Sequence, residues 1–162
     1  MEPSDVDLLY QWENNTQLWY TSDTLKPFSR NILQHFVENE QFDIYQAKQI
    51  RLMIDALDIN KTVGMVDLFD FDPYNKRVGI GIMIHNDYRN KGYASKAIEL
   101  TVDYCFNFLA INQIFCEIAQ SNTPSLNLFE KLGFEITGQK KKWKFTGKNF
   151  EDVYFLQLLN NI

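Results

Sequence analysis

The chain has 162 residues, 45% of them hydrophobic and 23% charged, and its formal net charge is −5. This composition is typical of a globular protein with a full hydrophobic core, so we expect a single domain over residues 1–162. The acidic balance disfavours broad binding to nucleic-acid phosphates. The sequence shows no N-terminal leader pattern and no apolar run of membrane-spanning length. We therefore expect a cytoplasmic protein that binds neither nucleic acid nor membrane.

Two helices are predicted before residue 40. Ser4 and Asp7 have capping-box spacing ahead of apolar residues, which predicts a helix that begins near Ser4. Ser29 precedes a second amphipathic helix, whose apolar residues recur at helical spacing as Ile32, Leu33, Phe36 and Val37. The polar and aromatic segment 12–28 between them has no steady period and is predicted to be a loop.

Three strands are predicted from residue 49 onwards. Residues 49–57, 62–71 and 77–85 form strand-like apolar runs that are separated by short turns. Because short turns join antiparallel neighbours, these segments are predicted to form a three-stranded meander.

The second half of the chain is predicted to mix helices and strands. The longest helix covers residues 91–109, and it is followed by a short strand at 113–119 and a capped helix at 122–133. Residues 134–145 and 150–159 are predicted to pair as a hairpin. The order α-α-β-β-β-α-β-α-β-β predicts an α+β fold, a mixed sheet with helices on its faces.

The two cysteines, Cys105 and Cys116, each lie in an apolar run without a CxxC pattern or a cysteine–histidine cluster nearby. Free cysteines in such surroundings are commonly core residues. Both are predicted to be buried, inert thiols, and no metal site is expected.

The stretch from His85 to Ala97, HNDYRNKGYASKA, connects a predicted strand to a predicted helix. Unpaired amides and the positive end of the helix dipole meet at such a helix start, and Arg89 and Lys91 add positive charge. Gly92 permits unusual dihedrals and the close approach of a ligand's oxygens. The stretch lacks the spacing of a P-loop or of a dinucleotide fingerprint. A pyrophosphate cradle and a plain turn with solvated charges are both compatible with it.

The wider arrangement favours the cradle. Arg89 to Ala94 resembles the R/Q-x-x-G-x-G/A signature of the GCN5-related N-acetyltransferases (GNATs) and lies, as in that family, between a strand and a helix. Asn122 to Phe134, NTPSLNLFEKLGF, resembles the family's second acetyl-CoA segment. The resemblance covers nearly the whole chain and is strongest to the branch of ribosomal-protein-alanine and spermidine or diamine acetyltransferases. It implies a mixed, mostly antiparallel sheet flanked by helices, with the fourth and fifth strands splayed.

The resemblance implies an acetyltransferase that uses acetyl-CoA as co-substrate and no metal. Acetyl-CoA would lie in the gap between the splayed strands, where an amine attacks the thioester directly. The backbone of Met83 and Ile84 would pair with the pantetheine arm, and one of their amides, with Met83 as the catalytic candidate, would stabilise the thioester carbonyl. The other implied cofactor contacts are Arg89, Asn90, Lys91, Gly92, Tyr93, Ala94, Ser95, Asn122 and Asn127.

Two features depart from the family pattern. Many members have a tyrosine that protonates the departing thiolate, seven residues after the asparagine of the second segment, and Phe129 stands at this position here. The general acid is therefore open, although a thiol with a pKa of about 8.5 is a fair leaving group without one. The family's first strand precedes the counterpart of residues 2–12, and we expect it to be missing or truncated here.

Glu117 is the candidate base for the attacking amine. An alkyl ammonium with a pKa of about 10 must lose a proton before attack. On the predicted strand Glu117 shares a face with Phe115 and Ala119, next to the implied gap. An ion pair with a lysine or arginine within the sheet is an equally weighted alternative. Asp67 is a weaker candidate base.

The acceptor pocket is implied to be walled by the loop after the first helix and by the second helix. Its candidate residues are Trp12, Glu13, Asn15, Trp19 and Tyr20. Aromatic rings and carboxylates suit a cation, whereas core packing is the alternative for each tryptophan. A small-molecule amine (a polyamine or diamine) and a protein N-terminus are both compatible acceptors, and the acidic charge slightly favours the polyamine.

The lysine-rich segment 140–144, KKKWK, is predicted to be a solvated strand face, with Trp143 and Phe145 directed into the core. It also motivates one alternative function, a ribosome-associated module. Phe129 motivates another, a catalytically silent acyl-CoA-binding relative. A homodimer is included among the expected assemblies.

Overall fold

The computed structural model of the chain describes residues 1–16, 19, 24–38 and 43–160. Residues within Met1–Ala47 pack mainly among themselves, and so do those within Lys48–Ile162. The chain is thus divided into an N-terminal and a C-terminal unit, and the assignment of residues 1–162 to one domain stays a prediction.

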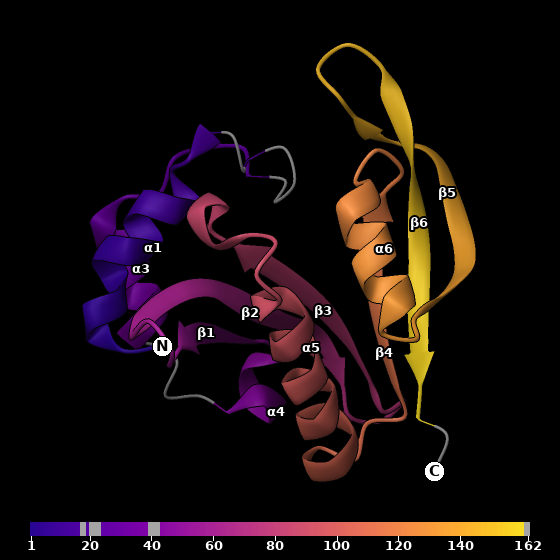
Figure 1. The fold of residues 1–162 in the computed structure, drawn as a ribbon, viewed down its shortest axis with the longest axis horizontal. Helices are drawn as coiled ribbons and strands as arrows, with labels where there is room; N and C mark the ends of the chain where they lie inside the picture. Colours follow the sequence, from indigo (N-terminus) through magenta and orange to yellow (C-terminus); the bar gives the residue numbers. More distant parts are fainter. Residues whose placement is uncertain (17–18, 20–23, 39–42, 161–162) are drawn as a thin grey trace. The chain divides into compact units, whose positions relative to one another are not determined.

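The N-terminal unit contains helices and connecting segments. After a 3-10 turn, η1 (Pro3–Asp5), it comprises α1 (Val6–Glu13), α3 (Arg30–Glu38) and α4 (Ile44–Ala47), drawn in indigo to violet in Figure 1. The two predicted helices are confirmed. No described residue ahead of Ile50 lies in a strand.

The N-terminal cap differs from the predicted capping box. The backbone N–H of Glu2 donates to the carboxylate of Asp5 at 2.7 Å. Asp7, which was expected to cap, instead forms an ion pair with Arg30 of α3. The Arg30 guanidinium also lies 4.4 Å from the centre of the Tyr10 ring. Asp7 therefore joins the two helices and does not close the start of the first one.

Asn14 attaches the segment ahead of α3 to the end of α1. Its side-chain amide donates to the carbonyl oxygens of Tyr10, at 2.9 Å, and of Phe28, at 3.0 Å. Its side-chain oxygen accepts from the Phe28 N–H at 2.8 Å. The two bonds with Phe28 satisfy backbone groups of a segment without regular structure and position it beside α1.

The C-terminal unit is built around a six-stranded sheet with the order β1-β2-β3-β4-β6-β5. The strands are β1 (Ile50–Ala56), β2 (Lys61–Asp72), β3 (Arg77–Ile84), β4 (Gln113–Ala119), β5 (Glu135–Phe145) and β6 (Phe150–Leu159). Every neighbouring pair is antiparallel except β3 and β4. The predicted meander, the hairpin and the mixed, mostly antiparallel sheet are confirmed.

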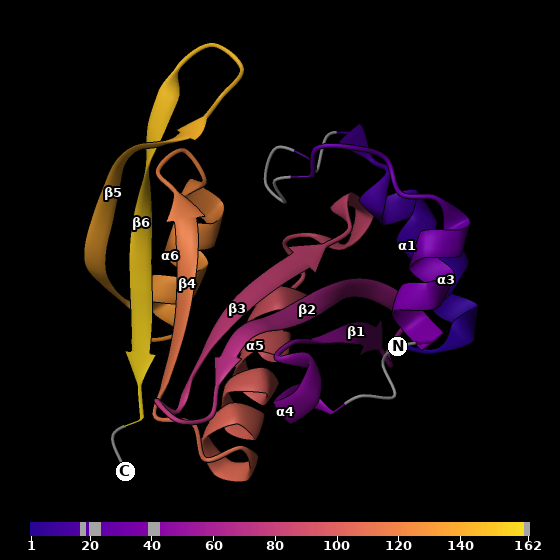
Figure 2. The ribbon, with the colours of Figure 1, turned by 180° about the vertical axis from the view of Figure 1, so that it is seen from behind.

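Two longer helices cover one face of this sheet. α5 (Tyr93–Asp103) continues as one π-helical turn, Tyr104–Phe108, and α6 (Thr123–Lys131) follows β4. Both helices lie in front of the sheet in Figure 1 and behind it in Figure 2. The strand side chains directed towards them form the core of the unit, which includes Val66, Leu68, Val78, Ile80, Ile114, Cys116, Ile118 and Leu156.

The pairing of β3 with β4 ends after three residue pairs. It joins Arg77–Gly79 to Gln113–Phe115, although β3 continues to Ile84 and β4 to Ala119. Figure 2 shows the two strands diverging beyond the paired part. These are the counterparts of the family's fourth and fifth strands, so the predicted splay is confirmed.

Three phenylalanine rings cross the sheet where the strands separate. The ring of Phe69 on β2 meets Phe115 on β4 edge-on, with 6.0 Å between ring centres, and Phe115 stacks on Phe155 of β6 at 5.5 Å. Gly79, the last paired residue of β3, lies beneath Phe69. A Cβ atom at Gly79 would lie 2.4 Å from Cε2 of that ring. The absence of a side chain at Gly79 thus allows the aromatic contact between the two halves of the sheet.

The prediction of core aromatics on β5 is wrong. Trp143 is 62% exposed and Phe145 is 57% exposed. The register between β5 and β6 shifts between Lys140 and Lys144, and Lys142 adopts a positive φ of 48°. Such a bulge breaks the strict alternation of side chains on which the prediction depended.

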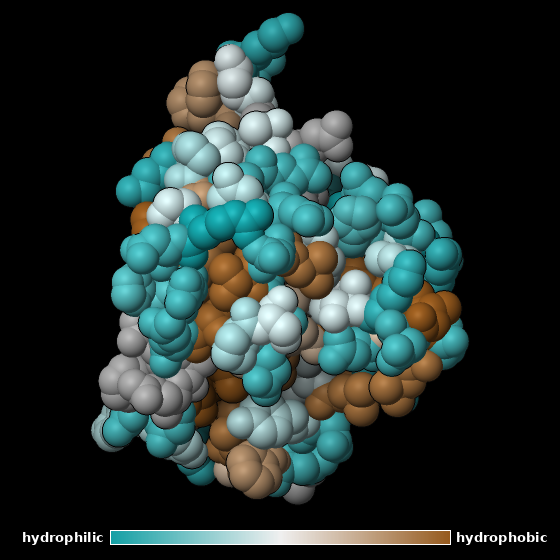
Figure 3. Space-filling model, turned by 90° about the vertical axis from the view of Figure 1, so that its left-hand side faces the viewer, coloured by the Kyte–Doolittle hydropathy of each residue, from teal (hydrophilic) through white to brown (hydrophobic). Residues whose placement is uncertain are grey.

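Hydropathy is uneven over the surface. On the face shown in Figure 3, hydrophilic residues predominate and hydrophobic residues gather in separate patches. None of the helices in the described part of the chain is both long and apolar enough to cross a membrane.

The prediction of buried, inert cysteines is confirmed. Cys105 is fully buried in the π-helical turn that continues α5, Cys116 is almost fully buried on β4, and neither forms a disulfide. Burial away from water disfavours the thiolate and raises the pKa of each thiol to about 12.

Both thiols are therefore expected to resist modification in the folded protein. At a given mildly alkaline pH, each should contain about a thousandfold less thiolate than an unperturbed cysteine. A disulfide reagent that releases a coloured thiol should react slowly with the native protein and quickly with both cysteines in denaturant. Rapid reaction of either cysteine in the native protein would contradict the burial.

Candidate functional site

The start of α5 presents a group of backbone amides without protein partners. β3 ends at Ile84, a 3-10 turn, η3 (Asn86–Tyr88), follows, and Gly92 precedes the first helical residue. Within the part of the chain that the structure describes, the amides from Asn90 to Ser95 donate to no backbone or side-chain acceptor; the next amide, Lys96 N–H, donates to Gly92 O at 3.1 Å. Free amides and the positive end of the helix dipole at one place suit an anion.

The left-handed conformation of Gly92 shapes this helix start. Its φ is +84°, which side-chain-bearing residues rarely adopt, and a Cβ atom added there would meet no heavy atom within 4 Å. Glycine is therefore required at this position by the backbone conformation, and not by a lack of space for a side chain. Asn90 also has a positive φ, 61°, which asparagine tolerates better than most residues.

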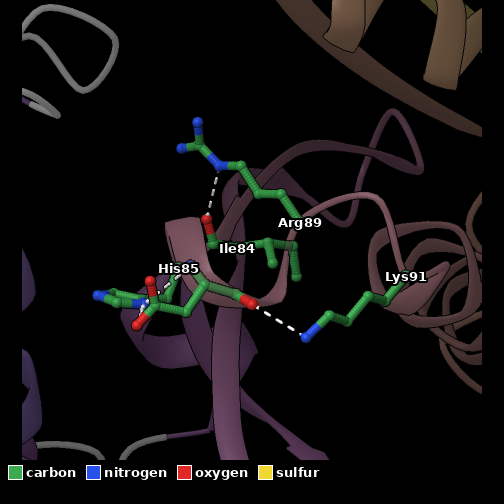
Figure 4. A network of polar contacts seen from close by, with 5 residues as sticks. Ile84, His85, Arg89 and Lys91 are labelled. Atoms are coloured by element: carbon green, nitrogen blue, oxygen red, sulfur yellow. Dashed lines mark hydrogen bonds and ion pairs between the residues drawn. The ribbon is translucent and has the colours of Figure 1, made fainter.

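Two cationic side chains donate hydrogen bonds to backbone carbonyls of their own loop. Nε of Arg89 donates to the carbonyl oxygen of Ile84 at 3.0 Å, and Nζ of Lys91 donates to the carbonyl oxygen of Asp87 at 3.0 Å. Figure 4 shows both bonds, with the outer end of the guanidinium directed away from Ile84. The loop is thus held in shape by the residues that also give it positive charge.

A contact not predicted from the sequence ties the helix start to the β1–β2 turn. The Tyr93 hydroxyl donates to Asp58, at 2.9 Å from Oδ2 and 3.2 Å from Oδ1. This hydrogen bond to the carboxylate raises the pKa of Tyr93. The two residues are 35 positions apart, and no pattern in the sequence pairs them.

Backbone alternation decides which amide of β3 faces the gap. The amide of His85 donates to Val63 O on β2 at 2.9 Å. In an antiparallel pair, successive residues direct their backbone groups to opposite edges of the strand. Met83 therefore faces β2, as His85 does, and Ile84 faces the gap beside β4. The geometry favours Ile84 and disfavours Met83 as the donor to a thioester in the gap.

The same rule identifies the facing groups of β4. The amide of Gln120 donates to Asp152 O on β6 at 2.9 Å, so Ala119 and Glu117 direct their backbone groups away from β6 and towards the gap. The ladder between β3 and β4 does not reach them. The gap is therefore bordered by main-chain groups from both strands.

The side chain of Glu117 is engaged in an ion pair. Nζ of Lys140 on β5 donates to the Glu117 carboxylate, and both side chains are 36% exposed. Lys140 also lies 4.7 Å from the centre of the Trp143 ring. The structure thus shows the ion pair that was the alternative to a catalytic base.

The weaker base candidate is more fully engaged. Asp67 accepts two hydrogen bonds from Arg51 on the neighbouring strand, at 2.6 and 2.8 Å. The Arg51 side chain is only 17% exposed. A carboxylate held by two hydrogen bonds from one guanidinium has a structural role, and Asp67 is therefore disfavoured as the catalytic base.

The second predicted cofactor segment forms the start of α6. The side chain of Asn122 accepts from Ser125 N–H at 3.4 Å, and its backbone N–H donates to Ala119 O at 2.9 Å. Asn127 lies on the exposed side of the helix. Phe129 is only 3% exposed and packs edge-on against Phe134, with 4.9 Å between ring centres. The position of the family's tyrosine is therefore filled by a core residue.

The predicted acceptor residues lie in the N-terminal unit. Trp12 is 5% exposed, which supports its alternative role in core packing. Nε1 of Trp19 donates to the carbonyl oxygen of Glu13 at 2.7 Å, and Asn15 N–H donates to Trp12 O at 3.1 Å. These bonds bring four of the five residues into one local cluster. Tyr20 lies outside the described residues.

Residues 1–135 match the family described as the acetyltransferase (GNAT) domain. The chain therefore belongs to the GNAT acetyltransferase family, and it is an acetyl-CoA-dependent acyltransferase. It is 33% identical over 157 residues to the SPbeta prophage-derived uncharacterized N-acetyltransferase YokL of Bacillus subtilis strain 168, with 96% of this chain and 85% of that protein covered. It is 24% identical to the spermidine N(1)-acetyltransferase of Escherichia coli strain K12, covering 86% and 72%.

Among solved structures, the fold is similar to that of the spermidine N-acetyltransferase from Vibrio cholerae in complex with CoA and spermine. The TM-score is 0.88 at 21% sequence identity, with 98% of this chain and 92% of that chain covered. At this identity the likeness concerns the fold.

Gly92→Ala is expected to weaken CoA binding. A left-handed conformation costs a residue with a Cβ about 1–2 kcal/mol, so the loop must be forced back into shape on binding and the Kd should rise about five- to thirtyfold. Calorimetric titration with CoA measures this. Gly147→Ala is the matched control, since Gly147 has a φ of +81° in equally open space on the β5–β6 turn. Equal CoA affinity in both variants would contradict the role of the loop.

Proposed function

We propose that this enzyme transfers the acetyl group of acetyl-CoA to a primary amine by direct attack within a ternary complex. One observation carries the proposal: β3 and β4 part after Gly79 and Phe115, next to a helix start whose amides have no partner among the residues that the structure describes. This arrangement provides an anion site for a pyrophosphate and an adjacent gap for an extended arm with amide groups.

Residues 89–95, the proposed pyrophosphate cradle, bind the cofactor through backbone amides and cationic side chains. The amides from Asn90 to Ser95 hold the pyrophosphate, and Arg89 and Lys91 supply positive charge beside it. Both side chains are already bonded to loop carbonyls, so their charges are held near the anion with little further ordering. Asn122 and Asn127, at α6, contact the pantetheine end.

The amide of Ile84 is the proposed donor to the thioester carbonyl. It replaces Met83 in this role because the backbone groups of Met83 face β2. A donor fixed before the reaction stabilises the negative charge that develops on the carbonyl oxygen, and loss of one such donor typically costs about 3 kcal/mol.

Glu117 is the proposed base, and the acceptor ammonium is its proposed partner during the reaction. The amine must lose a proton to attack, and the Glu117 carboxylate is on the strand that borders the gap. No general acid is assigned, because Phe129 has no proton to donate. The departing thiol, with a pKa of about 8.5, leaves as the thiolate and is protonated by solvent.

A polyamine or diamine is the preferred acceptor, with a protein N-terminus as the second choice. The net charge of −5 favours cations, and relatives named spermidine N(1)-acetyltransferase support the same class. Glu13, Asn15 and Trp19 are proposed to contact the acceptor, while burial makes Trp12 a supporting residue. The cytoplasmic location likewise stays a prediction.

An amine panel tests the proposal. Release of free thiol from acetyl-CoA is measured with spermidine, small diamines, amino acids and N-terminal peptides. The polyamines are expected to give the highest kcat/KM. Binding of acetyl-CoA without amine-dependent thiol release would indicate a silent acyl-CoA-binding relative, and no binding at millimolar acetyl-CoA would end the proposal. Co-sedimentation with ribosomes that decreases with added salt, as contacts of the lysine-rich segment 140–144 should, would favour the ribosome-associated alternative.

Glu117→Gln is expected to lower turnover at neutral pH by about 10²- to 10⁴-fold, the usual contribution of a positioned base, and to leave CoA affinity unchanged. Lys140→Met is the matched variant, because it breaks the same ion pair and keeps the carboxylate. Steady-state kinetics and calorimetry compare the two. If Glu117 serves only to pair with Lys140, both variants will have the same activity.

A further inference from the structure

Gly64 on β2 lies against the end of β3 more closely than any side chain allows. It is paired with Ile84 across the two strands. A Cβ atom built on Gly64 would lie 2.2 Å from the carbonyl oxygen of Met83, 2.8 Å from Cδ1 of Ile84 and 3.1 Å from Cα of Ile84. Real Cβ atoms essentially never approach another atom to less than 3.0 Å, so a side chain here requires something to move.

The nearest of these atoms belongs to the main chain. The other strand glycines differ in this respect. A Cβ at Gly79 would meet a phenylalanine ring, at Gly81 its nearest neighbour would be 3.8 Å away, and at Gly138 3.6 Å away. A ring can rotate or shift, whereas a strand carbonyl that takes part in a ladder can move only with its peptide.

The Met83 carbonyl and the Ile84 amide belong to one planar peptide group, in which the C=O and N–H point in opposite directions. The carbonyl lies on the Gly64 side, and the amide is directed into the gap. Any displacement of the carbonyl away from β2 therefore turns the Ile84 N–H by the same rotation. The direction of the Ile84 N–H therefore depends on the absence of a side chain at Gly64.

We propose that Gly64 is a positioning residue for the reaction. By lacking a side chain, it lets the Met83–Ile84 peptide lie flat against β2 with the Ile84 amide aimed at the thioester carbonyl. This inference rests on the proposed function, because it assigns a catalytic task to that amide. Gly64 itself contacts neither substrate.

Gly64→Ala is expected to lower kcat at least tenfold, approaching the 10²- to 10³-fold loss typical of a deleted oxyanion donor. The Kd for CoA should stay unchanged, because CoA has no thioester carbonyl and the amides of Asn90 to Ser95 lie on another segment. Gly81→Ala is the matched control on β3, two residues before Met83, where a Cβ has room. It should retain wild-type kcat.

A double variant separates the peptide from the neighbouring side chain. Ile84→Val removes Cδ1 and with it the 2.8 Å contact, so Gly64→Ala/Ile84→Val relieves side-chain crowding and keeps the close contacts with the main chain, the Met83 carbonyl at 2.2 Å and Cα of Ile84 at 3.1 Å. The double variant also provides the test if Gly64→Ala alone does not fold. The double variant should fold, bind CoA and have a kcat at least tenfold below that of Ile84→Val, which serves only as its reference.

The outcomes distinguish this proposal from the proposed function. No amine-dependent turnover in the wild type and in Gly81→Ala would refute the acetyl transfer itself. A wild-type kcat in Gly64→Ala, or its recovery in the double variant, would overturn the role of Gly64 alone. Failure of both Gly64 variants to fold, with the two controls folded, would show that the fold and not the amide needs the glycine, and would also overturn the proposal.

Discussion

The early end of the β3–β4 ladder is the constraint on which the rest of the structure depends. Beyond Gly79 and Phe115, two central strands have main-chain groups facing a gap instead of each other. An unmet main-chain group removed from water costs about 1–3 kcal/mol, so a protein keeps such a gap only where water or a ligand completes the bonding. Where the ladder ends, the phenylalanine contacts across β2, β4 and β6 add side-chain packing between the two halves of the sheet.

The helix start beside the gap adds charge to this arrangement. A chain with a net charge of −5 has to bind an anionic cofactor, and long-range attraction cannot supply the affinity. In the proposed function, local features supply it: amides that have no partner among the described residues, the dipole of α5 and two cations bonded to their own loop. The Tyr93–Asp58 hydrogen bond anchors the same helix start, and it introduces a carboxylate near the anion site. The hydrogen bond thus makes the helix start more rigid, while the Asp58 carboxylate repels a bound anion.

Local features were predictable from the sequence, and contacts between distant segments were not. The strands, the start of α5 and the burial of Cys105 and Cys116 follow from periodicity and from turn residues. The exposure of Trp143 and Phe145 could not be predicted, because a bulge at Lys142 changes the alternation of side chains along the strand and has no signature in the sequence. The Tyr93–Asp58 bond depends on how two loops meet in space. The choice between Met83 and Ile84 required the strand register, since a shift by one residue reverses it.

The Lys140–Glu117 ion pair is compatible with catalysis by Glu117. Both side chains are 36% exposed, and an ion pair of this exposure contributes about 1 kcal/mol or less. An arriving ammonium can therefore replace Lys140 at small cost. Lys140 already lies over the ring of Trp143, which offers its charge a second partner when the carboxylate is taken. Under the proposed role of Glu117, the lysine occupies in the free enzyme the place that a cationic acceptor would take during the reaction, so the carboxylate would have a partner at both stages.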